Sequence, residues 1–191
     1  MASIVRAIGV IGAGRVGRGI ALAVAMGGYR TILEDLLPNA LRRAQIEIRA
    51  SLDQATTFKR IPSGAADATL SRIEFAGSVE DTARAADLVI EAGPEEMESK
   101  IEIFTLLDKI CRPDTILVSS LISLSISEIA RVTYRPRNCV GMRFPPPGEA
   151  EARLEIIRGL ETDDQTLAAT MEVGRRMGRE VVVIKDVAAA S

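Results

Sequence analysis

Histidine is absent from this 191-residue chain. Its absence excludes imidazole acid–base chemistry, Ser-His-Asp triads and His-ligated metal sites from the chain itself. The only two cysteines, Cys111 and Cys139, lie far apart, which favours neither a disulfide framework nor a structural zinc site. We therefore expect no metal site, and we expect both cysteines to be buried apolar thiols in a reducing cytoplasm.

Aromatic residues are scarce as well, at 3%, with no tryptophan, and the formal net charge is only −2. These values leave little for base stacking or phosphate attraction, so no nucleic-acid partner is expected. No apolar run approaches the ~20 residues of a membrane span, and the N-terminus shows no signal-peptide pattern. Hydrophobic residues make up 47% and charged residues 26%, as in a cytoplasmic globular domain.

Apolar runs of strand length alternate with amphipathic stretches along the whole chain. The expected strands cover residues 7–11, 31–33, 73–75, 88–92, 115–118, 139–142, 154–157 and 181–184. The expected helices cover residues 16–26, 39–55, 66–70, 95–110, 125–132 and 163–177, with a further helix capped by Ser78. This order predicts an α/β fold: a doubly wound, largely parallel sheet with helices on both faces. We expect a single domain over residues 1–186, a stiff loop at residues 145–148, and a short tail over residues 187–191.

A glycine-rich motif follows the first expected strand and opens the first expected helix. It has the G-x-G-x-x-G pattern, and its residues are Gly12, Ala13, Gly14, Arg15, Val16 and Gly17. The first glycine makes the tight turn, the second removes a Cβ from the path of a pyrophosphate, and the third lets helix and strand pack closely. The free N–H groups at the start of the helix favour phosphate, so the motif predicts a Rossmann dinucleotide site.

An acidic residue completes the motif. Asp35 closes the second expected strand about 20 residues further along, where a carboxylate accepts hydrogen bonds from ribose hydroxyls. No basic residue follows directly at positions 36–38, and Glu34 is expected to add negative charge nearby. NAD is therefore predicted over NADP, while FAD and a structural turn without ligand stay open as alternatives.

Longer segments resemble the NAD-binding domain of the 3-hydroxyacyl-CoA dehydrogenase family. They are residues 9–21, 86–95 with Lys100, 123–126, 141–142, 154–155 and 184–186, in the family's order and spacing. The resemblance covers essentially the whole chain and implies an oxidoreductase-type domain of fatty acid metabolism with NAD as cofactor.

The resemblance also implies roles for individual residues. Gly12, Gly14, Gly17 and Asp35 would hold the adenosine diphosphate half of NAD, and Glu95 and Lys100 match positions near the nicotinamide half. For these two residues the alternative is a solvated pair near a helix start. Ser51 matches a serine that touches CoA in the family, and Lys59 lies near a matching lysine without aligning to it. For both, the alternative is a side chain that simply faces solvent from a polar helix end.

The family's catalytic segment is altered. Arg143 stands at the position of the catalytic histidine, and Pro146 replaces an asparagine. Ile122 stands where a substrate-binding serine is expected, with Ser123 one residue along. Of these positions only Glu155, which orients the histidine in the family, is retained. Because guanidinium stays protonated, Arg143 cannot accept a proton, and we expect it to form an ion pair with Glu155.

Three functions, besides a purely structural role, remain open from the sequence. The first is an active NAD-dependent 3-hydroxyacyl-CoA dehydrogenase. The second, which we favour, is an NAD(H)-binding domain with weak or no family activity. The third is an oxidoreductase in which Arg143 grips an anionic hydroxy acid. The family's C-terminal helical domain does not follow residue 191, so self-association through uncovered apolar surface is also expected.

Overall fold

The computed structural model describes residues 4–145 and 153–187. Its centre is one eight-stranded sheet with the order β3-β2-β1-β4-β5-β6-β7-β8. Every neighbouring pair is parallel except β6 and β7, which run antiparallel. The strands are β1 (Ala7–Ile11), β2 (Arg30–Glu34), β3 (Ile73–Ala76), β4 (Leu88–Glu91), β5 (Ile116–Ser120), β6 (Cys139–Arg143), β7 (Leu154–Arg158) and β8 (Val181–Lys185).

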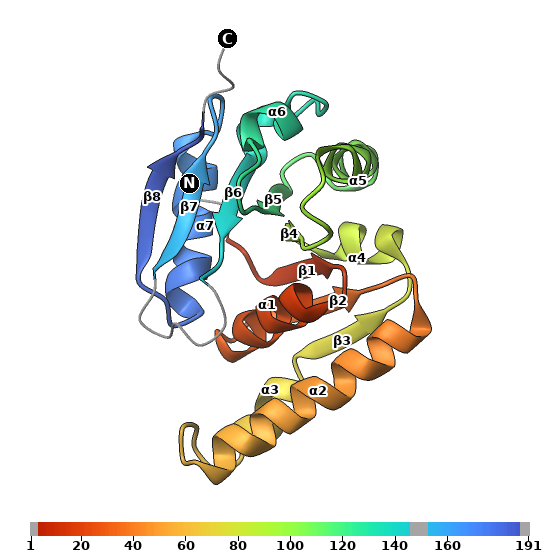
Figure 1. The fold of residues 1–191 in the computed structure, drawn as a ribbon, viewed down its shortest axis with the longest axis vertical. Helices are drawn as coiled ribbons and strands as arrows, with labels where there is room; N and C mark the ends of the chain where they lie inside the picture. Colours follow the sequence, from red (N-terminus) through yellow and green to blue (C-terminus); the bar gives the residue numbers. More distant parts are fainter. Residues whose placement is uncertain (1–3, 146–152, 188–191) are drawn as a thin grey trace.

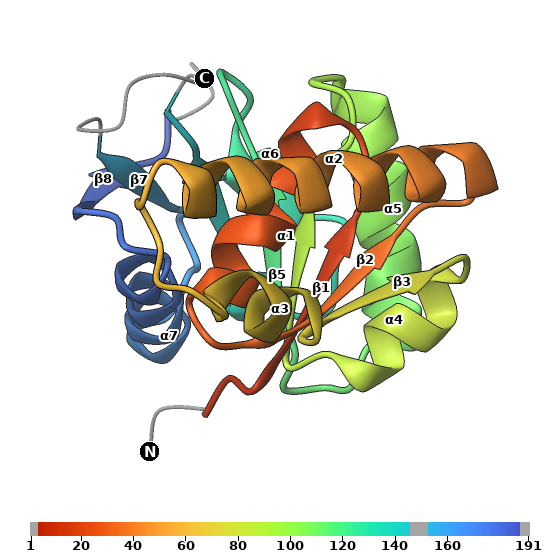
Figure 2. The ribbon, with the colours of Figure 1, turned by 90° about the horizontal axis from the view of Figure 1, so that it is seen from below.

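Helices cover both faces of this sheet (Figures 1 and 2). One face carries α1 (Arg15–Met26), α2 (Pro38–Thr57), α3 (Ala65–Leu70) and α7 (Asp164–Arg176). The other carries α4 (Val79–Ala85), α5 (Met97–Ile110) and α6 (Ile126–Ala130), and a short 3₁₀ helix, Pro136–Asn138, precedes β6. The doubly wound α/β fold predicted from the sequence is therefore confirmed.

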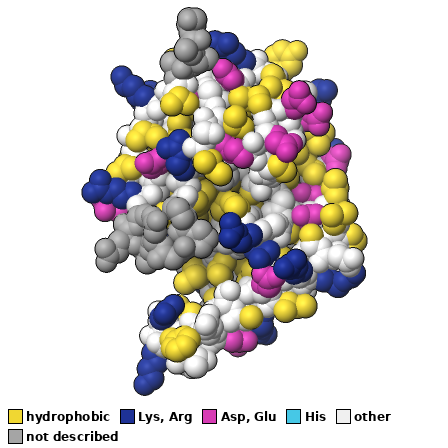
Figure 3. Space-filling model, in the orientation of Figure 1, with side chains coloured by type: hydrophobic (Ala, Val, Ile, Leu, Met, Phe, Trp, Pro, Cys, Tyr) yellow, Lys and Arg dark blue, Asp and Glu magenta, His cyan; other side chains and the backbone are white. Residues whose placement is uncertain are grey.

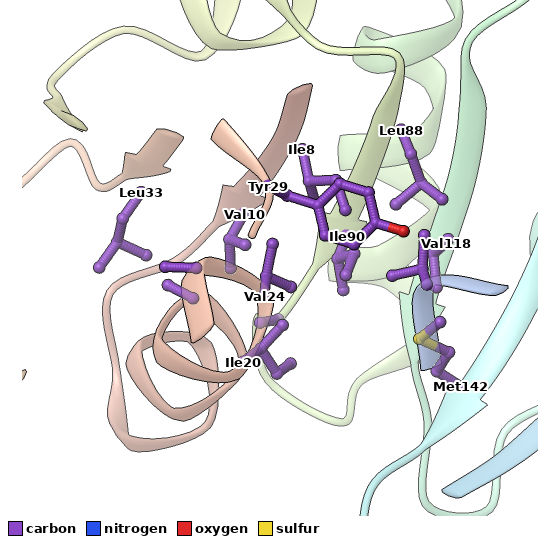
Figure 4. Packing of buried hydrophobic residues seen from close by; sticks show 14 of the residues in the cluster. Ile8, Val10, Ile20, Val24, Tyr29, Leu33, Leu88, Ile90, Val118 and Met142 are labelled. Atoms are coloured by element: carbon purple, nitrogen blue, oxygen red, sulfur yellow. The ribbon is translucent and has the colours of Figure 1, made fainter. Parts of the chain in front are cut away.

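Side-chain alternation along the strands divides the interior into two hydrophobic clusters. In β1, Ile8 and Val10 join the cluster under α1, whereas Ile11 joins the cluster under α4 and α5. Figure 4 shows strand residues of the first cluster directed toward Ile20 and Val24 of α1. Because both faces are buried, the strands read as continuous apolar runs, which is why their positions were readable from the sequence.

Most differences from the expected elements lie at their ends. The helix expected from residue 95 begins at Met97 after the cap residue Glu96, so Glu95 lies in the preceding loop. Both cysteines are buried, and burial raises the pKa of Cys111 to about 11 and that of Cys139 to about 12, so they remain thiols. Among the described residues, no helix combines the length and the apolar character that a membrane span requires.

Candidate dinucleotide site

The glycine turn lies at the carboxyl edge of the sheet, between β1 and α1. Gly12 adopts a φ of +100°, a conformation that favours glycine, and its N–H donates to the carbonyl oxygen of Glu34 at 2.9 Å. A Cβ on Gly17 would stand 1.8 Å from the carbonyl oxygen of Gly12, so only glycine allows α1 to approach the turn this closely. Two of the three motif glycines are thus explained by the fold alone.

Gly14 differs from the other two, because a Cβ built on it meets no atom within 4 Å. It is the N-cap of α1, and this helix start has neither a side-chain cap nor an acidic residue in its first turn. In contrast, Ser78, Ser125 and Asp163 accept N–H groups at the starts of other helices. The first N–H groups of α1 therefore have no side-chain acceptor, and the space beside Gly14 is open, next to the exposed residues Arg15 and Val16.

Asp35 lies next to this opening and is held in place by the backbone. Its Oδ2 accepts the N–H of Ala13 at 2.9 Å, and its Oδ1 accepts the N–H of Leu37 at 2.9 Å. A carboxylate offers about four acceptor positions, so two remain for hydroxyl groups. The structure thus brings together the turn and the acidic residue that the sequence predicted as partners.

Glu34 does not add a full negative charge at the surface, contrary to the expectation from the sequence. Its side chain is 2% exposed, and its Oε1 has no hydrogen-bond partner among the described residues. Burial, with repulsion from Asp35 and Glu80, raises the pKa of Glu34 to about 7. A large share of Glu34 is therefore neutral at pH 7.

Lys100 is neither half of a solvated pair nor a residue with spare donors. It is fully buried, and its Nζ donates to Glu91 at 2.9 and 3.2 Å and to the carbonyl oxygen of Ser120 at 2.9 Å. Glu91 also accepts the Ser119 hydroxyl at 2.6 Å and the N–H of Gly93 at 2.6 Å. These contacts use the three ammonium protons, so the ribose contact expected for Lys100 stays a prediction and requires one of them to be exchanged.

Glu95 is joined to Lys100 and to the loop that follows β5. Its Oε2 lies 3.9 Å from Lys100 Nζ, and its Oε1 accepts the N–H groups of Ile122, Ser123 and Leu124 at 2.8, 2.8 and 3.2 Å. Burial alone would raise the pKa of Glu95, but these N–H groups and Lys100 outweigh it and lower the pKa below its usual value. Glu95 is therefore an anion that shapes the loop.

Arg143 faces the same loop from the end of β6. Its Nη1 lies 2.5 Å from Glu155 Oε2, and its Nε donates to the carbonyl oxygen of Ile122 at 2.8 Å. The side chains of Arg143 and Glu155 are each 34% exposed. The internal ion pair expected from the sequence is present, and the guanidinium at position 143 cannot accept a proton.

The remaining candidate residues lie elsewhere. Ser51 lies within α2, where its exposed hydroxyl donates to the Glu47 carbonyl oxygen at 2.8 Å. Lys59 follows α2 and has a φ of 55°. Pro146 and the rest of the expected stiff loop from residue 146 lie outside the described residues, as do residues 188–191 of the expected tail.

Sequence reasoning missed Glu91 and Ser119 as members of the polar network. Both interrupt otherwise apolar strands, Glu91 at the end of β4 and Ser119 in β5. The signal was therefore visible: a charged residue at the end of a fully buried strand needs a partner, and a lysine nine positions later supplies it.

Comparison with known proteins adds a finding that the geometry cannot supply. Residues 7–187 match the family model of the 3-hydroxyacyl-CoA dehydrogenase NAD-binding domain. The chain is 36% identical over 186 residues to the 3-hydroxybutyryl-CoA dehydrogenase of Bradyrhizobium diazoefficiens, covering 97% of this chain but 63% of that protein. It thus spans less than two thirds of the length of that relative.

Solved structures agree with the family match. The (S)-3-hydroxybutyryl-CoA dehydrogenase PaaH1 from Ralstonia eutropha superposes with a TM-score of 0.91 at 32% identity, over 96% of this chain and 64% of that one. A second structure is an NAD⁺-dependent dismutase, the 5-dehydrogenase of 5-formyl-3-hydroxy-2-methylpyridine 4-carboxylic acid. It superposes with a TM-score of 0.83 at 29% identity, over 96% of this chain and 59% of that one.

Proposed function

We propose, from the premise that this chain belongs to the 3-hydroxyacyl-CoA dehydrogenase family as its NAD-binding domain, that it binds NAD(H) and has weak or no family activity as it stands. The binding domain is taken to comprise residues 1–186. NAD would serve as the hydride acceptor of such chemistry. The residues of this chain would hold and orient the cofactor.

The glycine turn supports the binding half of the proposal. The pyrophosphate would lie over Gly14, where no Cβ blocks its approach, and would accept N–H groups from the first turn of α1, with Ala13, Arg15 and Val16 beside it. Asp35 would accept the adenosine ribose hydroxyls and repel a 2′-phosphate, which favours NAD over NADP. Glu95 would face the nicotinamide half, with Lys100 positioning it.

The ion pair of Arg143 and Glu155 is the observation that carries the catalytic half. A dehydrogenase that oxidises a hydroxyl group needs a base to take the hydroxyl proton, and loss of such a base costs about 10²–10⁴-fold in rate. Here the side chain at that position is a guanidinium, 2.5 Å from Glu155 and bonded to the Ile122 carbonyl oxygen. The guanidinium cannot accept a proton and Glu155 is paired with it, so we expect turnover to be slow or absent.

A second function rests on the exposure of Arg143. The guanidinium has five N–H donors, of which the described contacts use two, and a third of the side chain is exposed. An anionic hydroxy acid could be held by the remaining donors. The dismutase related at 29% identity is named for a pyridine carboxylic acid, which supports a carboxylate as the alternative substrate.

Other partners follow from the family and the surface. An acyl-CoA remains a candidate ligand, with Ser51 exposed on α2. Large hydrophobic side chains are also exposed on and beside α2, where Figure 3 shows hydrophobic surface. They are Leu37 just before the helix, Ile46 within it and Phe58 just after it. Such a surface favours self-association, so a homo-oligomer is proposed.

Two measurements test the proposal. NADH and NADPH are titrated by fluorescence, and NADH oxidation is then followed with acetoacetyl-CoA for the wild type, Arg143→His and a matched surface control, Arg84→His. We expect NADH binding, little NADPH binding and negligible turnover in all three proteins. Brisk turnover by the wild type would overturn the catalytic half, and absence of NADH binding would overturn the whole proposal.

A carboxylate substrate is tested separately. Small 3-hydroxy acids are offered with NAD⁺ to the wild type and to Arg143→Gln. Oxidation by the wild type that is lost in Arg143→Gln would favour the second function over the first.

A further inference from the structure

Glu34 is the last residue of β2, and its side chain lies on the face of the sheet opposite α1. In the strand register it pairs with Ile11 of β1, and Ile11 pairs in turn with Glu91 of β4. Ile11 and Glu91 both face the α4 and α5 side. Because partners in parallel strands point to the same face, Glu34 also faces that side, at the carboxyl edge of the sheet.

The direction of a bound dinucleotide follows from the two contacts already assigned to it. The pyrophosphate would lie at the start of α1, on one face of the sheet, and the ribose at Asp35, above the tip of β2. From a ribose at Asp35, the base would continue away from the pyrophosphate, toward the opposite face of the sheet and the region between β2 and α4. Glu34 is the buried polar side chain at that end of β2.

The carboxyl group of Glu34 has an unused hydrogen-bonding position. Glu34 as a residue is 2% exposed, and its buried Oε1 has no partner among the described residues. A polar atom left unpaired in a buried place costs free energy, and a bound ligand that pairs with it would remove that cost. A neutral carboxyl group carries one donor and one acceptor side by side, which matches the exocyclic amine of adenine and the ring nitrogen next to it.

We propose that Glu34 recognises the adenine base of the dinucleotide, and so acts as a specificity-determining residue of the cofactor site. This inference rests on the proposed NAD(H) function. The side chain must leave its buried rotamer to reach the base. In that contact the neutral carboxyl group donates to the ring nitrogen and accepts from the amine.

The charges around Glu34 give the contact a pH dependence. Burial and two negative groups, the neighbouring Asp35 and Glu80 on α4, raise the pKa of Glu34. Its partners in the adjacent strands, Ile11 of β1 and Ala76 of β3, are apolar. Ionisation of Glu34 removes its O–H donor and adds a third negative charge, after Asp35 and Glu80, beside an anionic ligand. Affinity for NAD⁺ should therefore fall as the pH rises through about 7.

The experiment compares NAD⁺ with 1,N⁶-etheno-NAD⁺, in which the amine and the adjacent ring nitrogen are bridged. Dissociation constants are measured by calorimetry at pH 6 and pH 8.5 for the wild type, Glu34→Gln, Glu34→Val and the exposed control Glu102→Val. Comparing ratios between nucleotides cancels any general effect of a substitution on the fold.

In the wild type at pH 6 we expect NAD⁺ to bind about three- to tenfold more tightly than the etheno analogue. Glu34→Val should lose that preference, Glu34→Gln should keep it without the pH dependence, and Glu102→Val should match the wild type. Equal ratios in the wild type and Glu34→Val would overturn the role of Glu34. If neither nucleotide binds the wild type at all, the proposed NAD(H) function fails as well, and the two failures are thus distinguished.

Discussion

Replacing single glycines of the turn by alanine should separate folding from cofactor binding. Gly14 and Gly17 lie three residues apart in the same motif, but a Cβ meets nothing within 4 Å at Gly14 and a backbone oxygen at 1.8 Å at Gly17. Gly14→Ala should therefore fold like the wild type and bind NADH poorly. Gly17→Ala should be destabilised as a whole.

The magnitudes follow from these contacts. At Gly17 the backbone of the turn must move by more than an ångström, a strain of about 3–5 kcal/mol, from which the better helix propensity of alanine recovers about 1 kcal/mol. At Gly14 the extended φ of −65° and ψ of −174° suit any residue, and exchanging glycine for alanine at an N-cap costs about 0.5 kcal/mol. We therefore expect a loss of about 2–4 kcal/mol for Gly17→Ala and nearly none for Gly14→Ala.

Urea unfolding followed by circular dichroism measures the stability, and NADH fluorescence measures the binding. For Gly14→Ala we expect an unchanged unfolding midpoint and an affinity for NADH that is at least about tenfold weaker, since the new methyl group occupies the path of the pyrophosphate. Unimpaired NADH binding by Gly14→Ala would refute the placement of the pyrophosphate over this residue.

Three further tests address buried or partly buried charges by urea unfolding. In the wild type, where the pKa of Glu34 is raised to about 7, stability should fall by up to about 3 kcal/mol as the pH rises from 4.5 to above 7. Glu34→Gln should remove this pH dependence. A variant with the same pH profile as the wild type would show that Glu34 does not titrate in this range. Lys100→Met should cost about 3–5 kcal/mol because Glu91 is left buried without a cation, and adding Glu91→Met should recover most of it; no recovery would contradict the pairing. Partial burial raises the pKa of Asp87. The N–H groups of Arg6 and Ala7 and the Arg112 guanidinium lower it by more, so its pKa lies below the usual value. Asp87→Asn should therefore cost about 1–2 kcal/mol at pH 7, and the cost should shrink as the pH falls through the lowered pKa of Asp87.

The fold and the cofactor turn were predictable because local patterns determine them. Strands buried on both faces read as apolar runs, and the glycine spacing has a single geometric explanation at Gly12 and Gly17. The ion pair of Arg143 with Glu155 was also predictable, but only through the family resemblance, which placed two distant residues opposite each other.

Other parts of the site were out of reach because they depend on burial and on contacts between distant segments. Glu34 was expected to be charged because the sequence does not show that its side chain is 2% exposed. Lys100 was expected to have free donors because its partners Glu91 and Ser120 belong to two different strands. A charged residue is easily assigned to solvent or ligand when its protein partner is not yet known.

One ion pair and two hydrogen bonds form a connected path from Lys100 to Arg143. Lys100 lies beside Glu95, Glu95 binds the N–H of Ile122, and the carbonyl oxygen of the same Ile122 accepts from Arg143. Charged side chains thus bind both the N–H and the carbonyl oxygen of Ile122. A histidine at position 143 is shorter than arginine, so we expect it to give up the contact with the Ile122 carbonyl oxygen and to release one end of this path. For that reason we expect Arg143→His to supply a base without restoring the loop that must present a substrate to it.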